Sequence, residues 1–402
     1  MKKALHGNLL VGQSGGPTAV INASLAGVVH EAQRNRCFGR VYGLVHGIEG
    51  ALHNELIELS NETRDNLAQL SRTPSSALGS CRHKLREEDF DPILEVFRSH
   101  DIRHFIYIGG NDSMDTCHRI WSAAADANHE IQVAGVPKTV DNDVARTDHC
   151  PGYGSAARFY ALTARDAGRD LEAMATFDDV TILETMGRNA GWLAASTVLA
   201  KTTEHEAPNL VYVPEVSFEE GKFLESVARV HSRLGRVFVV VSEGLRDAQG
   251  DFVGAKDSDK TDEFGHVLHQ LSTGVAAYLN ERIHTELALR SRFLRPGLIG
   301  RSLSACRSEI DLDEAWKVGQ EAVRYLSEGR SGEMVVLERR SSQPYACEVG
   351  FAPLQEVANE EHLLPADWVS SEGSGMEDEF WEYASPLVGK LESLARVQGA
   401  KI

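Results

Sequence analysis

The sequence has no uninterrupted apolar run that could cross a membrane, which takes about 20 residues. Its first residues, Met1 to His6, lack the long apolar segment of a secretory signal peptide. Cysteine is scarce, and the six cysteines are scattered without a CxxC pair or another metal-binding spacing. We therefore expect a cytoplasmic protein whose thiols are reduced and mostly buried.

Positive charge is also in short supply. Lysine and arginine total 41 against 59 aspartates and glutamates, which gives a formal net charge of -18 at pH 7. A chain this acidic repels the phosphates of nucleic acid and of anionic membranes, so neither is expected as the main partner. An anionic substrate would need a local cluster of cations, because the molecule as a whole repels it.

Two common catalytic signatures are missing as well. None of the 16 histidines falls in an HExxH pattern, and the chain contains no GxSxG. With 402 residues, 42% of them hydrophobic, the chain is long enough for two or three domains with hydrophobic cores. Short apolar runs typical of strands lie at residues 8–11, 40–45, 104–108, 133–136, 179–183, 209–213 and 236–241. Helical stretches follow most of them, and this alternation predicts an α/β fold with mostly parallel sheets.

The polar stretch 137–143 directly follows the buried strand at 133–136. Open α/β sheets bind their ligands beside the carboxyl ends of their strands, so this position favours a functional site. The stretch holds a cation, a hydroxyl and two carboxylates two positions apart, Asp141 and Asp143. One carboxylate can act as a base while the other orients substrate or metal. Taken alone, the stretch is equally compatible with a simple Asx-type turn.

Other strand ends carry similar signals. Residues 14–16 form a glycine loop before a helix, which suits a phosphate, although a tight turn is an equally good interpretation. Residues 109–113 combine two glycines with a possible metal ligand. Arg188 stands at the start of a helix, where charge and helix N–H groups can bind a phosphate together. The basic loop 78–84 would face a phosphate only if residues 14–16 lie beside it.

Four motifs in one order, residues 14–16, 109–113, 137–143 and 186–188, resemble those of the phosphofructokinase family, and the resemblance extends over roughly the first 310 residues. Within the family, Asp112 together with Lys138 is similar to the diphosphate-dependent branch, since the ATP-using relatives have glycine at both places. The resemblance implies Mg²⁺-dependent, reversible transfer of a phosphoryl group from diphosphate to the 1-hydroxyl of fructose 6-phosphate. The products would be fructose 1,6-bisphosphate and phosphate, in glycolysis or gluconeogenesis.

The resemblance also implies two domains, each with a mostly parallel sheet between helices, and an active site in the cleft between them. A larger domain that binds the phosphoryl donor would comprise residues 1–147 and about 275–310. Residues 148–274 would bind fructose 6-phosphate, and residues 311–402 would form C-terminal helices and an acidic surface segment.

Roles carry over residue by residue. Asp141 would be the base that takes the proton from the 1-hydroxyl of the sugar, with Asp112 and Lys138 completing the catalytic group, and Asn111 would lie at the metal. The residues implied in substrate binding are Gly16 and Arg82 on the donor, Thr139 and Asp143 beside the base, Met186, Gly187 and Arg188 on fructose 6-phosphate, Glu243 on the sugar, and Arg292 and Arg301 on its 6-phosphate.

Three positions depart from the family pattern. Asn111 replaces the aspartate that binds magnesium, and because an amide is a poorer ligand, Asp112 or water would share the coordination. Leu298 stands where the ATP-dependent relatives have a histidine on the sugar phosphate. Asp179 stands where bacterial ATP-dependent enzymes have an arginine that crosses between subunits.

The family completes its sugar site with arginines from a neighbouring subunit, and this chain keeps Arg292. The resemblance therefore implies a homodimer or homotetramer. Two alternatives stay open: an ATP-dependent 6-phosphofructokinase, and a non-catalytic regulatory subunit that binds sugar phosphate. The Asp112 and Lys138 pair counts against the first, and the presence of the base Asp141 counts against the second.

Overall fold

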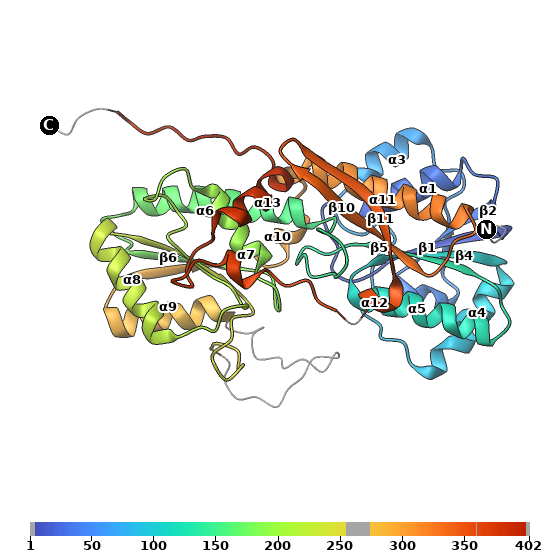
Figure 1. Cartoon of the computed structure of the whole chain (residues 1–402), viewed down its shortest axis with the longest axis horizontal. Helices are drawn as coiled ribbons and strands as arrows, with labels where there is room; N and C mark the ends of the chain where they lie inside the picture. The colour runs from blue at the N-terminus through green and yellow to red at the C-terminus, as the bar shows by residue number, and fades with distance from the viewer. Residues whose placement is uncertain (1–4, 255–273, 359, 399–402) are drawn as a thin grey trace.

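The computed structural model describes residues 5–254, 274–358 and 360–398. Two sheets, each with helices on both faces, form two lobes that lie side by side along the long axis of the molecule (Figure 1). Within the described ranges, no helix combines the length and the apolar character that crossing a lipid bilayer requires.

The larger lobe is built on a seven-stranded sheet in the order β11-β10-β5-β4-β1-β2-β3. Its strands are β1 (Gly7–Gln13), β2 (Phe38–Leu44), β3 (Leu56–Glu58), β4 (Ile102–Gly109), β5 (Gln132–Pro137), β10 (Glu333–Ser342) and β11 (Tyr345–Pro353). The five inner strands pair in parallel, and the outer strands β3 and β11 are antiparallel to their neighbours.

Helices cover both faces of this sheet because its inner strands are apolar on both sides. Along β4, Phe105 and Tyr107 enter one core while Ile106 and Ile108 enter the other, as the two-residue period of a strand requires. One face packs against α1 (Ile21–Ala32), α3 (Arg64–Ser71) and α11 (Glu309–Ser327). The opposite face packs against α2 (Ile48–His53), α4 (Phe90–Ser99), α5 (Asn111–Asp126) and α12 (Leu354–Val357).

The smaller lobe is built on a four-stranded, fully parallel sheet in the order β7-β8-β6-β9. Its strands are β6 (Val180–Thr185), β7 (Leu210–Tyr212), β8 (Val237–Ser242) and β9 (Ser291–Leu294). On one face lie α6 (Tyr153–Ala173), α7 (Trp192–Ser196) and α13 (Asp378–Val388), and on the other lie α8 (Glu220–Leu234) and α9 (Gly274–Leu287). The short helix α10 (Ile299–Ser302) packs against α6.

The predicted α/β fold with mostly parallel sheets is confirmed, but two assignments need correction. Residues 275–310 were expected in the larger domain, whereas β9 pairs with β6 in the smaller sheet. Residues 311–402 were expected to hold only helices and an acidic surface segment, whereas β10 and β11 extend the larger sheet. The four residues of β9 are exposed or half-buried, β10 has a buried apolar run of only four residues before its charged end, and β11 is mostly half-buried. The sequence also has a helical pattern at roughly residues 266–284, which begins outside the described residues, and its described part lies in α9.

Candidate active site

Three predicted site loops meet at one edge of the larger sheet, because β1, β4 and β5 are parallel neighbours that end there. Backbone hydrogen bonds join the loops to one another. The N–H of Ser14 donates to the carbonyl of Ile108 (2.9 Å), and the N–H of Lys138 donates to the carbonyl of Gly109 (3.0 Å). The glycine loop, the start of α5 and the stretch 137–143 are therefore held together as one surface.

Lys138 is buried against the glycine loop. The residue is only 4% exposed, and its Nζ donates a hydrogen bond to the carbonyl of Gly16 at 3.1 Å. Burial lowers the pKa of Lys138 to about 8, although the negative charges of Asp143 and Asp141 oppose the shift. The carboxylates that act on the Lys138 ammonium are those of Asp143 and Asp141, and Asp112 is not among the charges that shift its pKa. The ammonium is thus held beside the proposed donor loop.

The turn that carries Asp141 is fixed on both sides. The N–H of Asp141 donates to Oγ1 of Thr139 (3.1 Å). Asn142 adopts the left-handed conformation (φ 58°), which asparagine tolerates better than most residues. Its Nδ2 donates to the hydroxyl of Tyr383 (2.8 Å), and its Oδ1 accepts from the N–H of Cys150 (2.9 Å). These bonds leave the turn little freedom to move.

The carboxyl group of Asp141 has an oxygen whose hydrogen-bonding capacity is unused. Its Oδ1 is buried and has no hydrogen-bond partner among the described residues. Burial raises the pKa of Asp141, and the negative charges of Asp143 and Glu243 raise it further. The positive charges of Lys138 and Arg188 act in the opposite direction without reversing the shift. A buried oxygen without a partner is costly, so this position suits a group that a ligand completes.

A second buried oxygen without a partner lies at the start of α5. Asn111 donates from Nδ2 to the carbonyl of Asp143 (3.2 Å), while its Oδ1 has no partner among the described residues. An amide oxygen is a ligand that a hard cation accepts, and Asp143, to which Asn111 is bonded, carries a carboxyl group of the same kind. In the part of the chain that the structure describes, no three His, Cys, Asp or Glu side chains form a metal cluster. Asp112 is exposed on the first turn of α5.

The smaller lobe contributes the loop after β6. The N–H of Met186 donates to the hydroxyl of Tyr160 (3.2 Å), and the hydroxyl of Ser242 donates to the carbonyl of Gly187. Gly187 has φ 113°, and a methyl group in place of its hydrogen would lie 2.4 Å from the carbonyl oxygen of Ala190. Only glycine fits there, so the loop geometry depends on it.

Arg188 brings the two lobes into one site. Its side chain is partly exposed, and its positive charge opposes the raised pKa of Asp141 in the larger lobe and of Glu243 in the smaller. Burial raises the pKa of Glu243, with a further contribution from Glu184. The N–H of Glu243 donates to the carbonyl of Thr185 (3.0 Å), which places Glu243 at the strand ends. One guanidinium therefore acts on carboxyl groups from both lobes.

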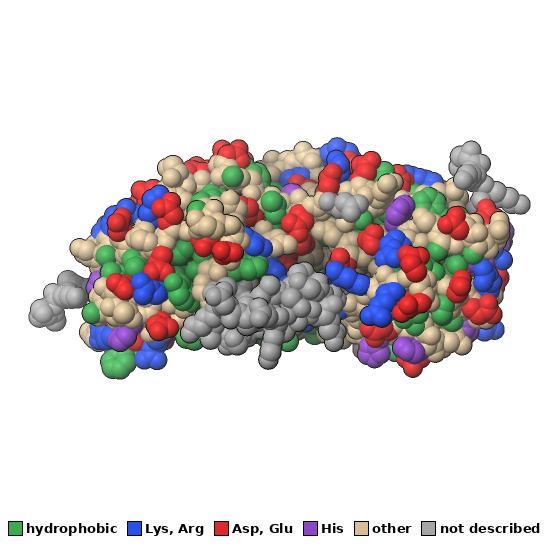
Figure 2. Space-filling model, turned by 90° about the horizontal axis from the view of Figure 1, so that it is seen from below, with side chains coloured by type: hydrophobic (Ala, Val, Ile, Leu, Met, Phe, Trp, Pro, Cys, Tyr) green, Lys and Arg blue, Asp and Glu red, His purple; other side chains and the backbone are tan. Residues whose placement is uncertain are grey.

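Two more arginines, Arg301 and Arg82, lie near the glycine loop. A methyl group in place of the Gly16 hydrogen would lie 2.9 Å from Nη1 of Arg301, on α10. Burial lowers the pKa of Arg301, and the positive charge of Arg82 lowers it further. On the face that Figure 2 shows, acidic and basic side chains are mixed over both lobes. The gathering of Arg82, Arg301 and Lys138 is thus the local cation cluster that an anionic ligand of this acidic protein needs.

Arg292 is the predicted site residue that the structure does not bring to the others. It lies on β9 opposite Thr181, and its Nε donates to Oδ1 of Asp178 at 2.8 Å, with the side chain 60% exposed. Thr181 precedes Thr185 by four positions, about 13 Å along a strand. Arg292 is therefore near the opposite end of the smaller sheet from the loop at Arg188.

Sequence reasoning did not find several residues of the site. Tyr160 lies in the middle of α6, where a tyrosine has no pattern to separate it from other core residues. Residues 360–364 contact the Asp141 turn from the far end of the chain, and their sequence carries no motif.

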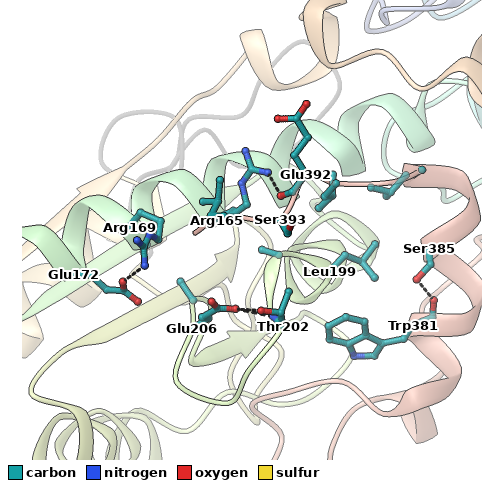
Figure 3. Close-up of a pocket in the computed structure, with 17 residues that line it drawn as sticks. Arg165, Arg169, Glu172, Leu199, Thr202, Glu206, Trp381, Ser385, Glu392 and Ser393 are labelled. Atoms are coloured by element: carbon teal, nitrogen blue, oxygen red, sulfur yellow. Dashed lines mark hydrogen bonds and ion pairs between the residues drawn. The ribbon is translucent and has the colours of Figure 1, made fainter. Parts of the chain in front are cut away.

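A separate cavity of about 240 Å³ lies in the smaller lobe, between α6, α13 and the segment that follows α13 (Figure 3). None of the predicted site residues lines it.

Residues 8–326 match the family model described as Phosphofructokinase. The chain is 43% identical over 389 residues to pyrophosphate–fructose 6-phosphate 1-phosphotransferase of Xanthomonas campestris pv. campestris, covering 95% of this chain and 92% of the relative. It is 39% identical over 388 residues to the protein of the same name from Halomonas elongata, covering 95% and 91%. The crystal structure of pyrophosphate-dependent phosphofructokinase from Marinobacter aquaeolei aligns with a TM-score of 0.86 at 36% identity, over 98% of this chain and 94% of that one.

Proposed function

Because the chain belongs to the phosphofructokinase family, we propose that it is the phosphotransferase that moves a phosphoryl group reversibly between diphosphate and the 1-hydroxyl of D-fructose 6-phosphate. Its relatives from Xanthomonas and Halomonas are named for this reaction, which supports diphosphate as the donor. The observation that carries the proposal is the buried Asp141 oxygen without a partner, beside cations of both lobes.

Asp141 acts as the general base. It takes the proton of the sugar 1-hydroxyl while that oxygen forms a bond to the terminal phosphorus of diphosphate. The bond from this phosphorus to the bridging oxygen breaks, and inorganic phosphate leaves with the bonding electrons. A pKa raised by burial brings the carboxyl closer to the operating pH, where a general base is most effective.

The larger lobe binds the donor. The ammonium of Lys138 and the guanidinium group of Arg82 offset the charge of diphosphate at the glycine loop. Arg301, which the family resemblance puts on the 6-phosphate of the sugar, reaches the same loop from α10 of the smaller lobe. Backbone N–H groups of that loop add a sequence-independent phosphate contact. In the smaller lobe, Met186, Gly187 and Arg188 hold fructose 6-phosphate and Glu243 contacts its hydroxyl groups. This division leaves the reacting atoms between the lobes.

Mg²⁺ fits the oxygen atoms that remain open. Asn111 Oδ1 and the carboxyl of Asp143 would hold it, with diphosphate and water filling the other positions, as Mg²⁺ commonly prefers. When bound, the ion neutralises charge on the phosphoryl oxygens. The amide of Asn111 keeps its place through the hydrogen bond to the carbonyl of Asp143.

We further propose a homo-oligomer, dimer or tetramer, in which Arg292 serves the sugar site of a neighbour. The support is its position on an edge strand, away from the site of its own chain. Phe177, whose ring lies under the Arg292 guanidinium, is exposed, as are Phe293 and Leu294 on the same strand, and a second copy would cover this apolar edge. Sedimentation that finds an active monomer at assay concentration contradicts this. Of the six cysteines, all of them described, Cys81, Cys117 and Cys150 are buried and the other three are half-buried.

The decisive experiment is a coupled assay of the purified protein with fructose 6-phosphate and magnesium, comparing diphosphate with ATP. We expect turnover with diphosphate and little with ATP. Comparable turnover with both donors would favour a donor-tolerant enzyme. Binding of fructose 6-phosphate without turnover of either donor would favour the regulatory subunit instead.

A further inference from the structure

After α12 the chain crosses from the larger lobe to the smaller one, on its way to α13 (Figure 1). The described residues of this crossing, 360–364, lie beyond the segment 8–326 that matches the family model. They run between the turn of Asp141 and the loop that follows Arg188. We call residues 360–364 the crossing strap.

On the larger-lobe side, the crossing strap bonds directly to the catalytic turn. The N–H of His362 donates to the carbonyl of Asp143 (2.9 Å), and Nδ1 of His362 lies 3.1 Å from the carbonyl of Asn142. A carbonyl only accepts, so Nδ1 carries the proton in this contact. Glu361 forms an isolated antiparallel bridge with Val144, just after the turn.

On the smaller-lobe side, the same residues bond to the loop after Arg188. Nε1 of Trp192 donates to the carbonyl of His362 (2.9 Å), and the two rings lie 4.8 Å apart. Nδ2 of Asn189 donates to Oε1 of Glu361 (2.8 Å). Glu361 and His362 therefore each contact both lobes.

A second link runs through Glu215, which follows β7. Its Oε1 accepts from the N–H of Gly191 (2.8 Å) and from the N–H of Leu364 (3.0 Å). The strap is thus anchored to the smaller-lobe loop directly at Asn189 and Trp192, and through Glu215 at Gly191.

We propose that the crossing strap sets the position of the Asp141 turn relative to the Arg188 loop, and that His362 is its positioning residue. The inference rests on the proposed function, in which Asp141 and Arg188 come from different lobes and act on one sugar. Phosphoryl transfer requires the attacking oxygen and the base in alignment, and a small misplacement slows the reaction strongly. His362 touches neither substrate nor metal in this proposal and acts through the backbone carbonyls of the turn.

The test compares His362→Leu with His362→Asn. Leucine keeps the apolar volume but removes the side-chain donor to Asn142, whereas asparagine places an amide N–H close to the former Nδ1. We expect His362→Leu to lower kcat about tenfold with the KM for fructose 6-phosphate changed less than about twofold, and His362→Asn to recover most of the loss. Glu372→Gln serves as the control, because Glu372 joins the same C-terminal region to Arg229 by an exposed ion pair away from the turn.

Hydrogen exchange supplies a readout that does not depend on activity. In His362→Leu the amides of 141–144 and of 188–192 should both exchange faster, while β1 and β8 keep their protection. If His362→Leu does not fold, Asn189→Ala replaces it, since this exposed amide contacts the strap from the other side and its loss should lower kcat about threefold.

The outcomes separate the two proposals. A wild type without turnover of either donor overturns the proposed function alone, and hydrogen exchange still tests the strap. A wild type that is active, with unchanged kcat and unchanged exchange in His362→Leu, overturns the strap and leaves the function intact. A loss that His362→Asn does not recover also overturns the role of the donor at position 362.

Discussion

The two lobes present their charged groups to the site in different ways. In the larger lobe Lys138 is 4% exposed, and the turn of Asp141 is held by hydrogen bonds on both sides. In the smaller lobe Arg188 is partly exposed, and the side chain of Arg292 is 60% exposed on an edge strand. Burial in the larger lobe shifts the pKa of Lys138 down and that of Asp141 up.

This difference suggests that the larger lobe carries out the chemical step and that the smaller lobe binds the sugar phosphate. A buried ion is sensitive to its surroundings, so the larger lobe can adjust proton affinity and charge at the reacting atoms. A guanidinium keeps its charge at any physiological pH and meets a phosphate through two N–H groups, which suits binding. Variants of the larger lobe should therefore change kcat and the pH profile, and variants of the smaller lobe should change KM.

The largest effect is expected at Asp141. Asp141→Ala removes the base, and loss of a general base lowers kcat by about 100-fold or more. The KM for fructose 6-phosphate should change little, because the sugar phosphate is bound by the smaller lobe. Steady-state kinetics measure both, with Asp141→Asn as the variant that keeps the shape. Near-native turnover in either variant would remove Asp141 from the mechanism and erase the difference between the lobes.

The next effect is expected at Lys138. Lys138→Met keeps the buried chain but removes the ammonium, and a lost charge-assisted contact lowers kcat/KM for diphosphate by about 30-fold. The pKa of Lys138 is lowered to about 8, so its ammonium is present below that pH and is lost as the pH rises through it. The wild-type kcat/KM for diphosphate should therefore fall above about pH 8.

The residual activity of Lys138→Met should lack this alkaline fall, because the group that titrates is gone. Rates measured between pH 6 and 10 for both proteins decide the matter. An alkaline fall that persists unchanged in Lys138→Met would assign it to another group and leave the burial of Lys138 without a role in the chemistry.

The larger-lobe site was largely predictable from the sequence. Strands β1, β4 and β5 are short apolar runs with buried side chains on both faces, and the polar residues that follow them stand where parallel strands end. Parallel neighbours bring such loops together. The order of the strands is not local information, so the grouping of Gly16, Asn111 and Asp141 rested on the resemblance to the phosphofructokinase motifs.

The rest depended on contacts that no local pattern encodes. β9 has only four residues, most of them exposed, so its place beside β6 could not be read from periodicity. In β10 the short apolar run is followed by charged residues such as Arg339 and Arg340, and this pattern does not indicate a hairpin with β11. The crossing strap meets Trp192 from 170 positions away, with an ordinary hydrogen bond and no motif.

The smaller lobe provides the opposite test of the comparison. Arg188→Met removes the guanidinium from the loop that we assign to the sugar phosphate, so the KM for fructose 6-phosphate should rise about tenfold. The kcat should stay within about threefold, because Asp141 and Lys138 remain in place. Arg188→Lys should recover only part of the affinity, since an ammonium cannot form the two parallel hydrogen bonds of a guanidinium. A fall in kcat that exceeds the rise in KM would mean that the smaller lobe also takes part in the chemical step.

The smallest effect is expected at Asp112, which the family resemblance groups with Lys138 as the mark of the diphosphate-dependent branch. Lys138 is buried against Gly16, whereas Asp112 is exposed on the first turn of α5 and is not among the charges that shift the pKa of Lys138. An exposed carboxylate acts on an approaching nucleotide through water and salt, which weaken its repulsion of the additional phosphate. Asp112→Asn should therefore raise turnover with ATP by no more than about threefold and leave diphosphate kinetics unchanged. Asp115→Asn, one turn further along the helix, controls for a general change in charge. If Asp112→Asn alone gave strong ATP activity, donor choice would rest on an exposed residue, and burial in the larger lobe would not explain selectivity.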